Sequence, residues 1–428
     1  MKILVVGGGG REHAVVRKLA QSPRVSNIVV APGNAGIARE AESSGKDIEC
    51  VAIGATDIPA LVEYAKNNAV DYAVVTPDDP LVMGAVDEFA AAGIPAFGPS
   101  KAAAQLEGSK TFAKKFMARN HIPTAAYATF DEPNAALEYV AQAELPIVVK
   151  ADGLALGKGV TIALTHQEAE SAIREAMLDR RFGESGARVV IEEFLTGPEV
   201  TVLAFTDGKT LVPMVSSMDH KRLNNGDHGP NTGGMGTIAP NPLYTAEIAQ
   251  RCMEEIFLPT VRGMTADGVP FKGCLYFGLM LTADGPKVIE YNCRFGDPEA
   301  QVVLPLLRSD LLEIMEATTA GTLADATVDF APGAAACIVM SAEGYPIAPR
   351  KGDEITIPAD VYQSVYVAGA ADRNGALVTN GGRVLDVTAT AVDLKTALAE
   401  AYRKVAAIDF AGAHFRTDIG ARALEENA

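Results

Sequence analysis

The sequence has no tryptophan and few cysteines or histidines, and these shortages exclude several kinds of protein. The five cysteines are odd in number, widely spaced and without a C-x-x-C pair: Cys50, Cys252, Cys274, Cys293 and Cys337. The six histidines are scattered, with no two of them four residues apart. Neither a disulfide framework nor a zinc site built from cysteine and histidine is therefore supported.

Long apolar runs and an excess of positive charge are also missing. No apolar stretch reaches the roughly 18 residues needed to cross a bilayer, and Met1–Val6 is too short for a signal peptide and reads as a buried strand. The formal charge of −17 disfavours a phosphate backbone or an anionic membrane surface as partner. We expect a cytoplasmic protein that binds neither nucleic acid nor membranes, although a local basic cluster could still hold a small anion.

What is present is ample material for several cores, since 48% of the 428 residues are hydrophobic. The first hundred residues alternate apolar strands, at Lys2–Val6, Asn27–Ala31 and Tyr72–Thr76, with helical patterns such as Glu12–Gln21 and Leu81–Ala92. This βαβαβ rhythm predicts a doubly wound parallel sheet, an α/β fold that binds ligands at the carboxyl ends of its strands.

Two short segments containing proline and glycine divide the rest of the chain. The first, near Gly98–Ser100, precedes a second α/β unit over about 121–195, and a long helix is expected around Glu247–Asp267. The second, at Ala331–Gly333, precedes a strand-rich tail with a hairpin signal at Asn380–Gly382. We therefore predict three domains, over 1–100, 101–330 and 331–428.

The turn Gly7-Gly-Gly-Gly-Arg-Glu-His13 follows a strand and opens a helix, which gathers backbone N–H groups and a positive dipole end. It predicts a phosphate or ribose-phosphate site, and the alternative is an ordinary tight turn. A dinucleotide site is disfavoured because the second strand ends in Pro32-Gly-Asn34 rather than in an acid for the ribose hydroxyl.

A second glycine-rich loop runs from Lys150 to Val160 between two strands. It is not a Walker A loop, because Gly159 stands where Ser or Thr should hold magnesium. With Lys150 at its base and Lys158 at its tip, the loop is suited to fold over triphosphate oxygens, although exposed lysines are usually only solvated.

The strand Val288-Ile-Glu-Tyr-Asn292 has the most chemical content. Residues two apart on a strand point to the same face, so Glu290 and Asn292 present two oxygen ligands side by side. Magnesium prefers such oxygens and completes its shell with water and substrate phosphates. Arg294 and Asp297 follow closely. The alternative is an edge strand with surface ion pairs.

Three further segments each give only a weak indication of function. The acids of Ile191–Leu195, with Glu199, could accept hydrogen bonds from an adenine amino group or a ribose, or could be solvated edge carboxylates. Asp219–Arg222 is basic with a lone histidine, and Pro230–Gly236 is a flexible glycine-rich loop.

Taken in order, these segments resemble the ATP-grasp superfamily and, more closely, its phosphoribosylamine–glycine ligase family. The motifs that carry the resemblance are Gly8–Ala14, Gln105–Lys110, Lys150–Gly153, Gly157–Gly159, Asp219–Arg222, Gly229–Gly236, Glu290–Glu299 and Thr379–Arg383. They span nearly the whole chain. The fold implied is an N-terminal substrate domain, a two-lobed ATP-grasp unit whose lid lobe covers about 121–195, and a strand-rich C-terminal domain.

The resemblance also implies roles for particular residues. ATP would be held by Lys110, Lys150, Gly153, Gly157, Lys158, Gly159, Glu192, Glu193, Leu195 and Glu199. The other substrates would meet Gly9, Gly10, Arg11, His13, Asn34, Asp78, Asn231, Gly233, Gly234 and Asp297. Arg294, Lys221 and Asp219 would face the reacting groups, and Glu290 and Asn292 would bind Mg2+ or Mn2+.

The implied reaction joins glycine to 5-phosphoribosylamine at the expense of ATP, through glycyl phosphate, in a protein expected to be a monomer. Two departures stand out: Asp78 replaces the family's more usual Glu, and Phe277–Leu281 carries no second metal-binding acid. The rival predictions are another carboxylate–amine ligase, an NAD-dependent dehydrogenase and a non-catalytic nucleotide sensor.

Overall fold

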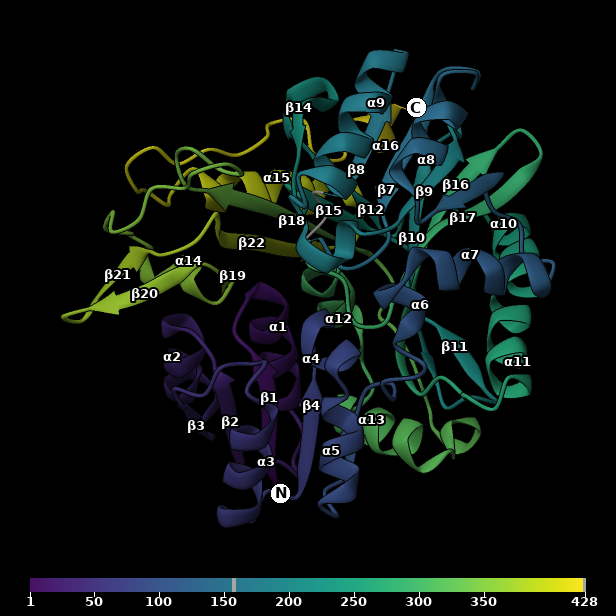
Figure 1. The fold of residues 1–428 in the computed structure, drawn as a ribbon. Helices are drawn as coiled ribbons and strands as arrows, with labels where there is room; N and C mark the ends of the chain where they lie inside the picture. The colour runs from purple at the N-terminus through teal and green to yellow at the C-terminus, as the bar shows by residue number, and fades with distance from the viewer. Residues whose placement is uncertain (156–158, 426–428) are drawn as a thin grey trace.

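A computed structural model describes residues 1–155 and 159–425 of the chain. It is a mixed α/β structure in which an N-terminal parallel sheet, two antiparallel sheets and a C-terminal sheet surround a common centre (Figure 1). No helix within these two described ranges is long and apolar enough to span a membrane.

The N-terminal sheet confirms the doubly wound prediction, with the parallel order β3-β2-β1-β4-β5. Its elements are β1 (Lys2–Gly7), α1 (Gly10–Leu19), β2 (Asn27–Pro32), α2 (Ala35–Ser44), β3 (Asp47–Cys50), α3 (Ile58–Asn67), β4 (Tyr72–Val75), α4 (Asp78–Met83), α5 (Ala85–Ala91) and β5 (Ala96–Phe97). Central β1 is fully buried over Ile3–Val6, because helices cover both faces of a parallel sheet. The helix expected over Leu81–Ala92 is split at Gly84, whose φ of 100° ends α4.

A small antiparallel sheet, β6-β9-β7-β8, lies at the top of Figure 1 with α8 and α9. Its elements are β6 (Tyr127–Phe130), α8 (Pro133–Val140), β7 (Ile147–Ala151), β8 (Val160–Ala163), α9 (His166–Ile173), a π-helical turn at Arg174–Leu178 and β9 (Val189–Glu193). The lobe has a hydrophobic core of its own, which includes Ala136, Val149, Ile173 and Ile191. We call residues 121–195 the lid lobe.

A larger antiparallel sheet, β11-β10-β16-β17, faces the lid lobe. Its strands are β10 (Glu199–Thr206), β11 (Leu211–Pro213), β16 (Gly273–Thr282) and β17 (Gly285–Asn292). The surrounding helices are α6 (Gln105–Gly108), α7 (Lys110–Arg119), α10 (Ala246–Cys252), α11 (Leu258–Ala266), α12 (Ala300–Leu306) and α13 (Leu311–Ala320). The single long helix expected around Glu247–Asp267 contains a π-helical turn at Met253–Phe257 between α10 and α11.

The C-terminal sheet joins segments from both sides of the boundary expected at Ala331–Gly333. Its order is β12-β15-β18-β22-β19, from β12 (Met218–Asp219), β15 (Gly236–Ala239), β18 (Ala334–Ser341), β19 (Val365–Val367) and β22 (Arg383–Ala391). The remaining elements are β13 (Arg222–Asn224), β14 (His228–Asn231), α14 (Ala359–Tyr362), β20 (Ala370–Arg373), β21 (Ala376–Thr379), α15 (Leu394–Val405) and α16 (Ala421–Glu425). The loop that carries the active-site candidates of 219–236 is therefore anchored in this sheet.

The hairpin expected at Asn380–Gly382 is wrong. β21 pairs with β20, and β22 pairs with β18 and β19, so this glycine-rich segment passes from one sheet to another. Which strand each neighbour pairs with is decided by tertiary packing rather than by the turn residues.

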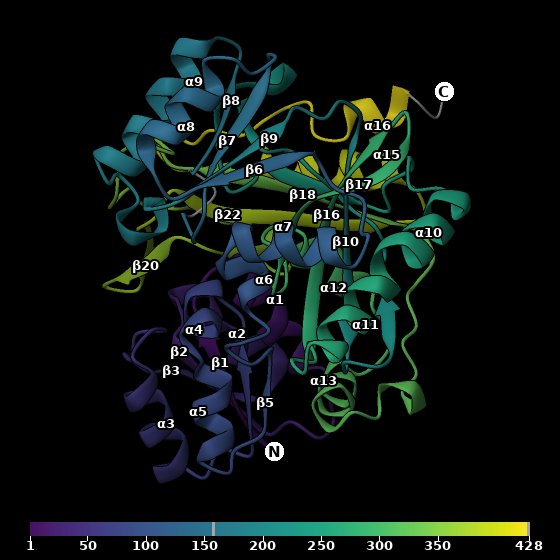
Figure 2. The same cartoon turned by 45° about the vertical axis from the view of Figure 1, so that its right-hand side comes forward.

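The N-terminal sheet and the large antiparallel sheet share a continuous hydrophobic core. Phe97 of β5 stacks on Phe295 with ring centroids 6.0 Å apart, and Phe205 of β10 meets both rings. Helix α12 packs on α1 in the same core. The carboxyl edge of the N-terminal sheet is thereby held against the central region, as Figure 2 shows from a second side.

Candidate active site

A cleft with a volume of about 1160 Å³ lies where the four parts meet. The N-terminal sheet contributes Arg11 and Asp78, and the lid lobe contributes Lys150 and Glu192. The large sheet supplies its β17 end, and further walls come from the segments 218–233, 345–346 and 416–425. The N-terminal sheet, both four-stranded antiparallel sheets and the C-terminal sheet therefore all reach this cleft, which makes it the candidate active site.

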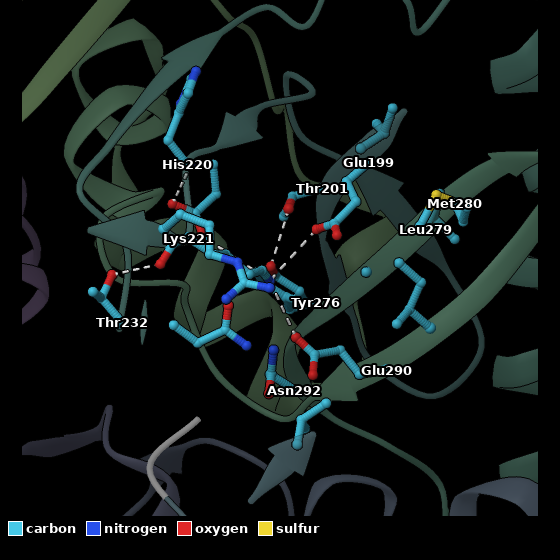
Figure 3. A pocket seen from close by; sticks show the side chains of 18 of the residues that line it. Glu199, Thr201, His220, Lys221, Thr232, Tyr276, Leu279, Met280, Glu290 and Asn292 are labelled. Atoms are coloured by element: carbon cyan, nitrogen blue, oxygen red, sulfur yellow. Dashed lines mark hydrogen bonds and ion pairs between the residues drawn. The ribbon is translucent and has the colours of Figure 1, made fainter. Parts of the chain in front are cut away.

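Glu290 and Asn292, at the end of β17, point into the cleft together (Figure 3). They pair with Gly278 and Tyr276 of β16. A Cβ atom at position 278 would stand 3.0 Å from Glu290 Cγ, so a side chain there would crowd the carboxylate. This close approach explains why the preceding strand carries no acid at the position next to Glu290.

Lys221 occupies the centre of the cleft and is surrounded by acids. Its ammonium lies 3.6 Å from Glu290 Oε1, 3.9 Å from Glu199 Oε2 and 4.0 Å from Asp219 Oδ2 (Figure 3). The adjacent Tyr276 and these carboxylates outweigh burial and raise the pKa of Lys221 well above its usual value. The side chain is therefore a fixed positive charge at neutral pH.

Burial alone would raise the pKa of Glu290, but Lys221, Lys150 and Lys110 more than offset it, and the net pKa is lowered. Glu290 is accordingly ionised at neutral pH. Converging lysines around one carboxylate are the arrangement expected where an anionic ligand and its counter-charges meet.

A row of lysines leads from Glu290 toward the lid lobe. Lys150 and Lys114 each lie 3.0 Å from a carboxylate oxygen of buried Glu192, and Lys110 donates to the Gly153 carbonyl at 3.1 Å. Burial lowers the pKa of Lys110 and lowers that of Lys114 to about 8, in the latter case against the opposing effect of Glu192. Lys114 was not foreseen; its signal is its place one helical turn after Lys110 on α7.

The described part of the glycine-rich loop, between β7 and β8, is held by backbone hydrogen bonds. Gly153 donates its N–H to the Ser185 carbonyl, and the Gly159 carbonyl accepts from Ala151. Gly157 and Lys158, which the sequence placed at the loop's tip, lie outside the described residues.

The far end of the cleft is an apolar slot beside the segment that follows β9. Glu193 turns to accept the Ala126 N–H at 2.9 Å and pairs with Lys287, so its side chain fixes the edge of the slot. Leu195 forms part of the wall. The other apolar side chains of the slot are Met117, Val148, Leu154, Ile162, Phe194, Leu279 and Met280. A flat ring system could enter between the two sheets here.

Only part of the glycine-rich turn that opens α1 reaches the cleft. Arg11 lines it and donates to the Phe295 carbonyl at 3.3 Å, while Gly9 donates its N–H to Glu12 Oε2 at 2.6 Å in a capping box. A Cβ at Gly10 would collide with Asp386. The turn is therefore packed closely against C-terminal side chains.

His13 and Asn34, which were expected at the ribose phosphate, are engaged elsewhere. His13 is fully buried, lies 2.8 Å from Glu40 and accepts the Val367 N–H at 2.8 Å. Asn34 caps α2 and donates to the Val367 carbonyl at 2.7 Å. Both side chains bind the N-terminal sheet to β19, and neither belongs to the described wall of the cleft. Their contact with substrate stays a prediction.

Arg383, at the start of β22, clamps two candidate segments and was not foreseen as a site residue. Its guanidinium donates to the Gly233 carbonyl at 2.6 Å, to the Asp297 carbonyl at 2.7 Å and to Asp297 Oδ2 at 2.7 Å. Asn231 lines the cleft beside Gly233, and the backbone of Gly234 turns against Asp219. The motif Thr379–Arg383 was the available signal, but nothing in it indicates what the arginine touches.

Two buried carboxylates, Asp219 and Glu299, stand behind Lys221. Burial and the charge of Glu299 raise the pKa of Asp219 well above its usual value, and burial likewise raises that of Glu299 despite Lys221. Tyr276 donates its hydroxyl to Glu299 Oε1 at 3.1 Å. Both carboxyl groups therefore bind a proton more readily than exposed carboxyl groups do.

Arg294 points its guanidinium into the cleft from just beyond β17. It pairs with buried Glu107 at 3.1 Å and donates to the Phe295 carbonyl at 3.2 Å, while its buried Nε has no hydrogen-bond partner among the described atoms. Burial raises the pKa of Glu107 to about 7 against the opposing charge of Arg294. The guanidinium thus places a positive charge in the wall of the cleft.

The donor set at the end of β17 fits a hard divalent cation. Within the part of the chain that the structure describes, no cluster of three or more His, Cys, Asp or Glu side chains could enclose a metal on its own. One carboxylate and one amide oxygen beside a lysine-lined anion path are instead the incomplete set that magnesium completes with water and phosphate oxygens.

Two antiparallel sheets that close over a cleft lined by lysines and carboxylates define the ATP-grasp class of proteins. The biotin carboxylase–beta-gamma-ATP complex from Campylobacter jejuni has this fold. It matches with a TM-score of 0.74 at 16% identity, over 97% of this chain and 92% of that one.

Within that class the chain belongs to the phosphoribosylglycinamide synthetase family. Residues 1–107 match its N domain, 108–300 its ATP-grasp (A) domain and 335–422 its C domain. The phosphoribosylamine–glycine ligases of Haemophilus influenzae and Vibrio cholerae are 50% and 49% identical to it, each over 99% of both chains. The crystal structure of phosphoribosylamine–glycine ligase from Thermotoga maritima matches with a TM-score of 0.85 at 33% identity, over 98% of this chain and all of that one.

Proposed function

We propose that this protein ligates glycine to 5-phosphoribosylamine, forming glycinamide ribonucleotide, ADP and phosphate in purine biosynthesis. The observation that carries the proposal is the full-length similarity to phosphoribosylamine–glycine ligases, together with a single cleft to which every domain contributes. Family membership implies the use of ATP and a divalent metal. We propose that this metal is Mg2+ or Mn2+, because the oxygen donors of Glu290 and Asn292 suit both ions.

ATP is proposed to lie between the lid lobe and the large sheet. The apolar slot beside Leu195 takes the adenine, Glu193 holds the backbone of Ala126 beside it, and Glu192 pairs with Lys150. Glu199, at the start of β10, is within reach of the ribose. The lysine row of Lys110 and Lys150 takes the phosphates, with residues 153–159 as the loop that covers them.

The reaction is proposed to run in two steps. A carboxylate oxygen of glycine attacks the γ-phosphorus, the bond to the bridging oxygen of ADP breaks, and glycyl phosphate forms. The amine nitrogen of 5-phosphoribosylamine then attacks the glycyl carbonyl carbon, phosphate leaves, and the nitrogen loses a proton. Such phosphoryl transfer depends mainly on positioning and on the neutralisation of charge.

Each step has residues of this chain suited to it. Lys221 and Arg294 line the cleft and are proposed to hold the carboxylate and the developing phosphate charge, and the Asp219–Glu299 pair is proposed as the acceptor for the amine proton. A divalent cation on Glu290 and Asn292, when bound, would neutralise phosphate oxygens. Arg11, Asp78, Asn231 and Asp297 form the wall proposed for the phosphoribosyl group.

An isotope experiment tests both the substrates and the order of bonds. Glycine labelled with 18O in both carboxylate oxygens should deliver one labelled oxygen to the released phosphate, with 5-phosphoribosylamine generated in the assay from ribose 5-phosphate and ammonia. Unlabelled phosphate would contradict the acyl phosphate step. Phosphate release that is indifferent to phosphoribosylamine, or faster with a different amino acid, would favour another carboxylate–amine ligase.

Domain boundaries are also part of the proposal: a substrate domain over 1–100, the ATP-grasp unit over 101–330 and a C-terminal domain over 331–428. A hydrophobic cluster of the N-terminal sheet supports the first boundary, whereas the C-terminal cluster also includes Met218 and Ile238 from before the second boundary. The protein is further proposed to be a cytoplasmic monomer, which light scattering on the purified protein and cell fractionation would test.

A further inference from the structure

The carboxylate of Glu107 reaches three consecutive residues at the end of β17, although it lies on the separate short helix α6. Its Oε2 accepts the Cys293 N–H at 2.6 Å, and its Oε1 pairs with Arg294 Nη2 at 3.1 Å. In the amide orientation that satisfies both ends of Asn292, the amide nitrogen donates to the same Oε1 at 2.9 Å and to the Tyr291 carbonyl at 3.3 Å.

Three donors therefore converge on one buried acceptor group. Glu107 is 7% exposed, and the thiol of buried Cys293 rests on the carbonyls of Ala103 and Ala104 just before α6. Since the Cys293 amide belongs to the backbone and Arg294 carries only donors, Asn292 is the one partner that could turn its other end toward position 107.

We propose that Glu107 is a positioning residue that fixes the amide of Asn292 with its oxygen toward the cleft. An asparagine amide has an acceptor end and a donor end of nearly equal shape, so only its neighbours decide which end faces a ligand. The carboxylate of Glu107 binds the donor end and thereby presents the acceptor end beside Glu290. This inference rests on the proposed metal role of Glu290 and Asn292.

The substitution Glu107→Gln tests the inference because it keeps the shape and removes one acceptor. If the new amide oxygen accepts from Cys293, its NH2 group faces Arg294 and Asn292. The Asn292 amide then turns over and presents a donor to the cleft, where a cation would be repelled. Loss of a group that orients a metal ligand typically costs about 10–100-fold in metal affinity.

The measurement is the affinity for Mn2+ in the presence of a non-hydrolysable ATP analogue, followed by electron paramagnetic resonance of free Mn2+. We expect Glu107→Gln to weaken Mn2+ binding by about 10–100-fold, with little change in binding of the analogue without metal. Hydrogen exchange of the 290–297 segment in the metal-free protein should increase. Glu88→Gln, the same change at an exposed position on α5, is the matched control.

A swapped pair distinguishes positioning from a merely structural role. In the double variant Glu107→Gln with Asn292→Asp, the new amide at 107 donates to the new carboxylate at 292, and an oxygen faces the cleft again. Compared with Asn292→Asp alone, which adds the same negative charge to the site, the double variant should lose little Mn2+ affinity, so the loss caused by Glu107→Gln should largely disappear. A single variant with wild-type Mn2+ affinity, or a swapped pair no better than the single variant, would overturn the proposal.

Should Glu107→Gln fail to fold, Glu107→Asp takes its place. The shorter side chain keeps the charge opposite Arg294 but cannot reach all three donors, so Mn2+ binding should still weaken, and unchanged binding would again overturn the inference. A failure of this inference can be told apart from a failure of the proposed function. Whether phosphate release requires phosphoribosylamine is measured on the unaltered protein and does not depend on any Glu107 variant.

Discussion

At the scale of the residue, Glu290 shows how its surroundings set the chemistry of one carboxylate. Strand geometry directs it to the same side as Asn292, and the absence of a side chain at Gly278 gives it space. Three lysines then hold its pKa below the usual value in spite of burial. The group is thus ionised and accessible, with about a third of its side chain exposed.

Glu290→Ala should abolish most of the turnover while leaving the protein folded. The side chain is not part of a hydrophobic core, so its loss leaves no large cavity, but it removes the only carboxylate proposed to bind the metal. We expect kcat to fall by roughly 100- to 1000-fold, the loss typical of one preorganised electrostatic contact. Steady-state phosphate release at saturating ATP measures the effect.

Glu247→Ala, at an exposed position of α10, is the control for this substitution and should keep normal activity. Near-normal turnover in Glu290→Ala, with circular dichroism unchanged, would remove the metal assignment.

At the scale of the element, the strand β22 delivers Arg383 to two loops that are distant in sequence. The planar guanidinium meets the Gly233 carbonyl and both the backbone and the side chain of Asp297. Such forked, charge-assisted contacts fix geometry better than a single charge can. The glycine-rich segment 231–234 is therefore held by the C-terminal sheet rather than by its own sequence.

Arg383→Lys keeps the charge but loses the fork, and should release the 231–234 segment from Asp297. Because these residues are proposed to contact glycine and phosphoribosylamine, the KM for those substrates should rise at least about tenfold, since one hydrogen bond to a charged group contributes roughly 1.5–3 kcal/mol. The KM for ATP should change less than about twofold, because the adenine slot lies at the other end of the cleft.

The matched control is Arg373→Lys on the exposed part of β20. A uniform rise of all three KM values in Arg383→Lys would indicate a general distortion of the cleft rather than a local role.

At the scale of the whole molecule, one buried joint connects the N-terminal and C-terminal sheets. His13 contacts Glu40 and Val367, and Arg17 lies over the Tyr366 ring at 4.4 Å while it donates to the Gln363 carbonyl at 2.9 Å. His13 and Asn34, both expected at the substrate, thus hold the domains in register together with Arg17. The shape of the cleft depends on this joint because the sheets on either side of it both line the cleft.

The buried contacts of His13 should make the free energy of unfolding depend on pH. Burial lowers the pKa of His13 to about 4 from 6.5, although Glu40 opposes this. Between those values the unfolded chain binds the extra proton, so the stability due to neutral His13 is present above pH 6.5 and is lost as pH falls toward 4. The shift corresponds to about 3 kcal/mol. His13→Gln should remove this part of the slope in urea unfolding between pH 7 and pH 4.

His220, which is also buried and has a pKa lowered to about 4 by burial and Arg416, should leave a residual slope in that variant. If His13→Gln shows the full pH dependence of the unaltered protein, His13 is not the group that titrates on unfolding.

The sequence by itself determined the local features: the parallel N-terminal sheet, the glycine-rich turn that opens α1 and the shared direction of Glu290 and Asn292. Each depends on spacing along one segment, such as the two-residue period of a strand or the buried apolar run of Ile3–Val6. The motifs also indicated the family, which the comparisons confirmed.

Only the tertiary structure decided which distant groups meet. Glu107, Arg383 and Lys114 act on partners that lie far away along the chain, and no local pattern encodes such contacts. The same reason explains why His13 faces β19 and why the segment at Asn380–Gly382 connects two sheets. Side-chain direction on a strand is fixed by covalent geometry, whereas the partner of a buried charge is fixed by packing, because burial requires that the charge be neutralised by whatever the fold brings near.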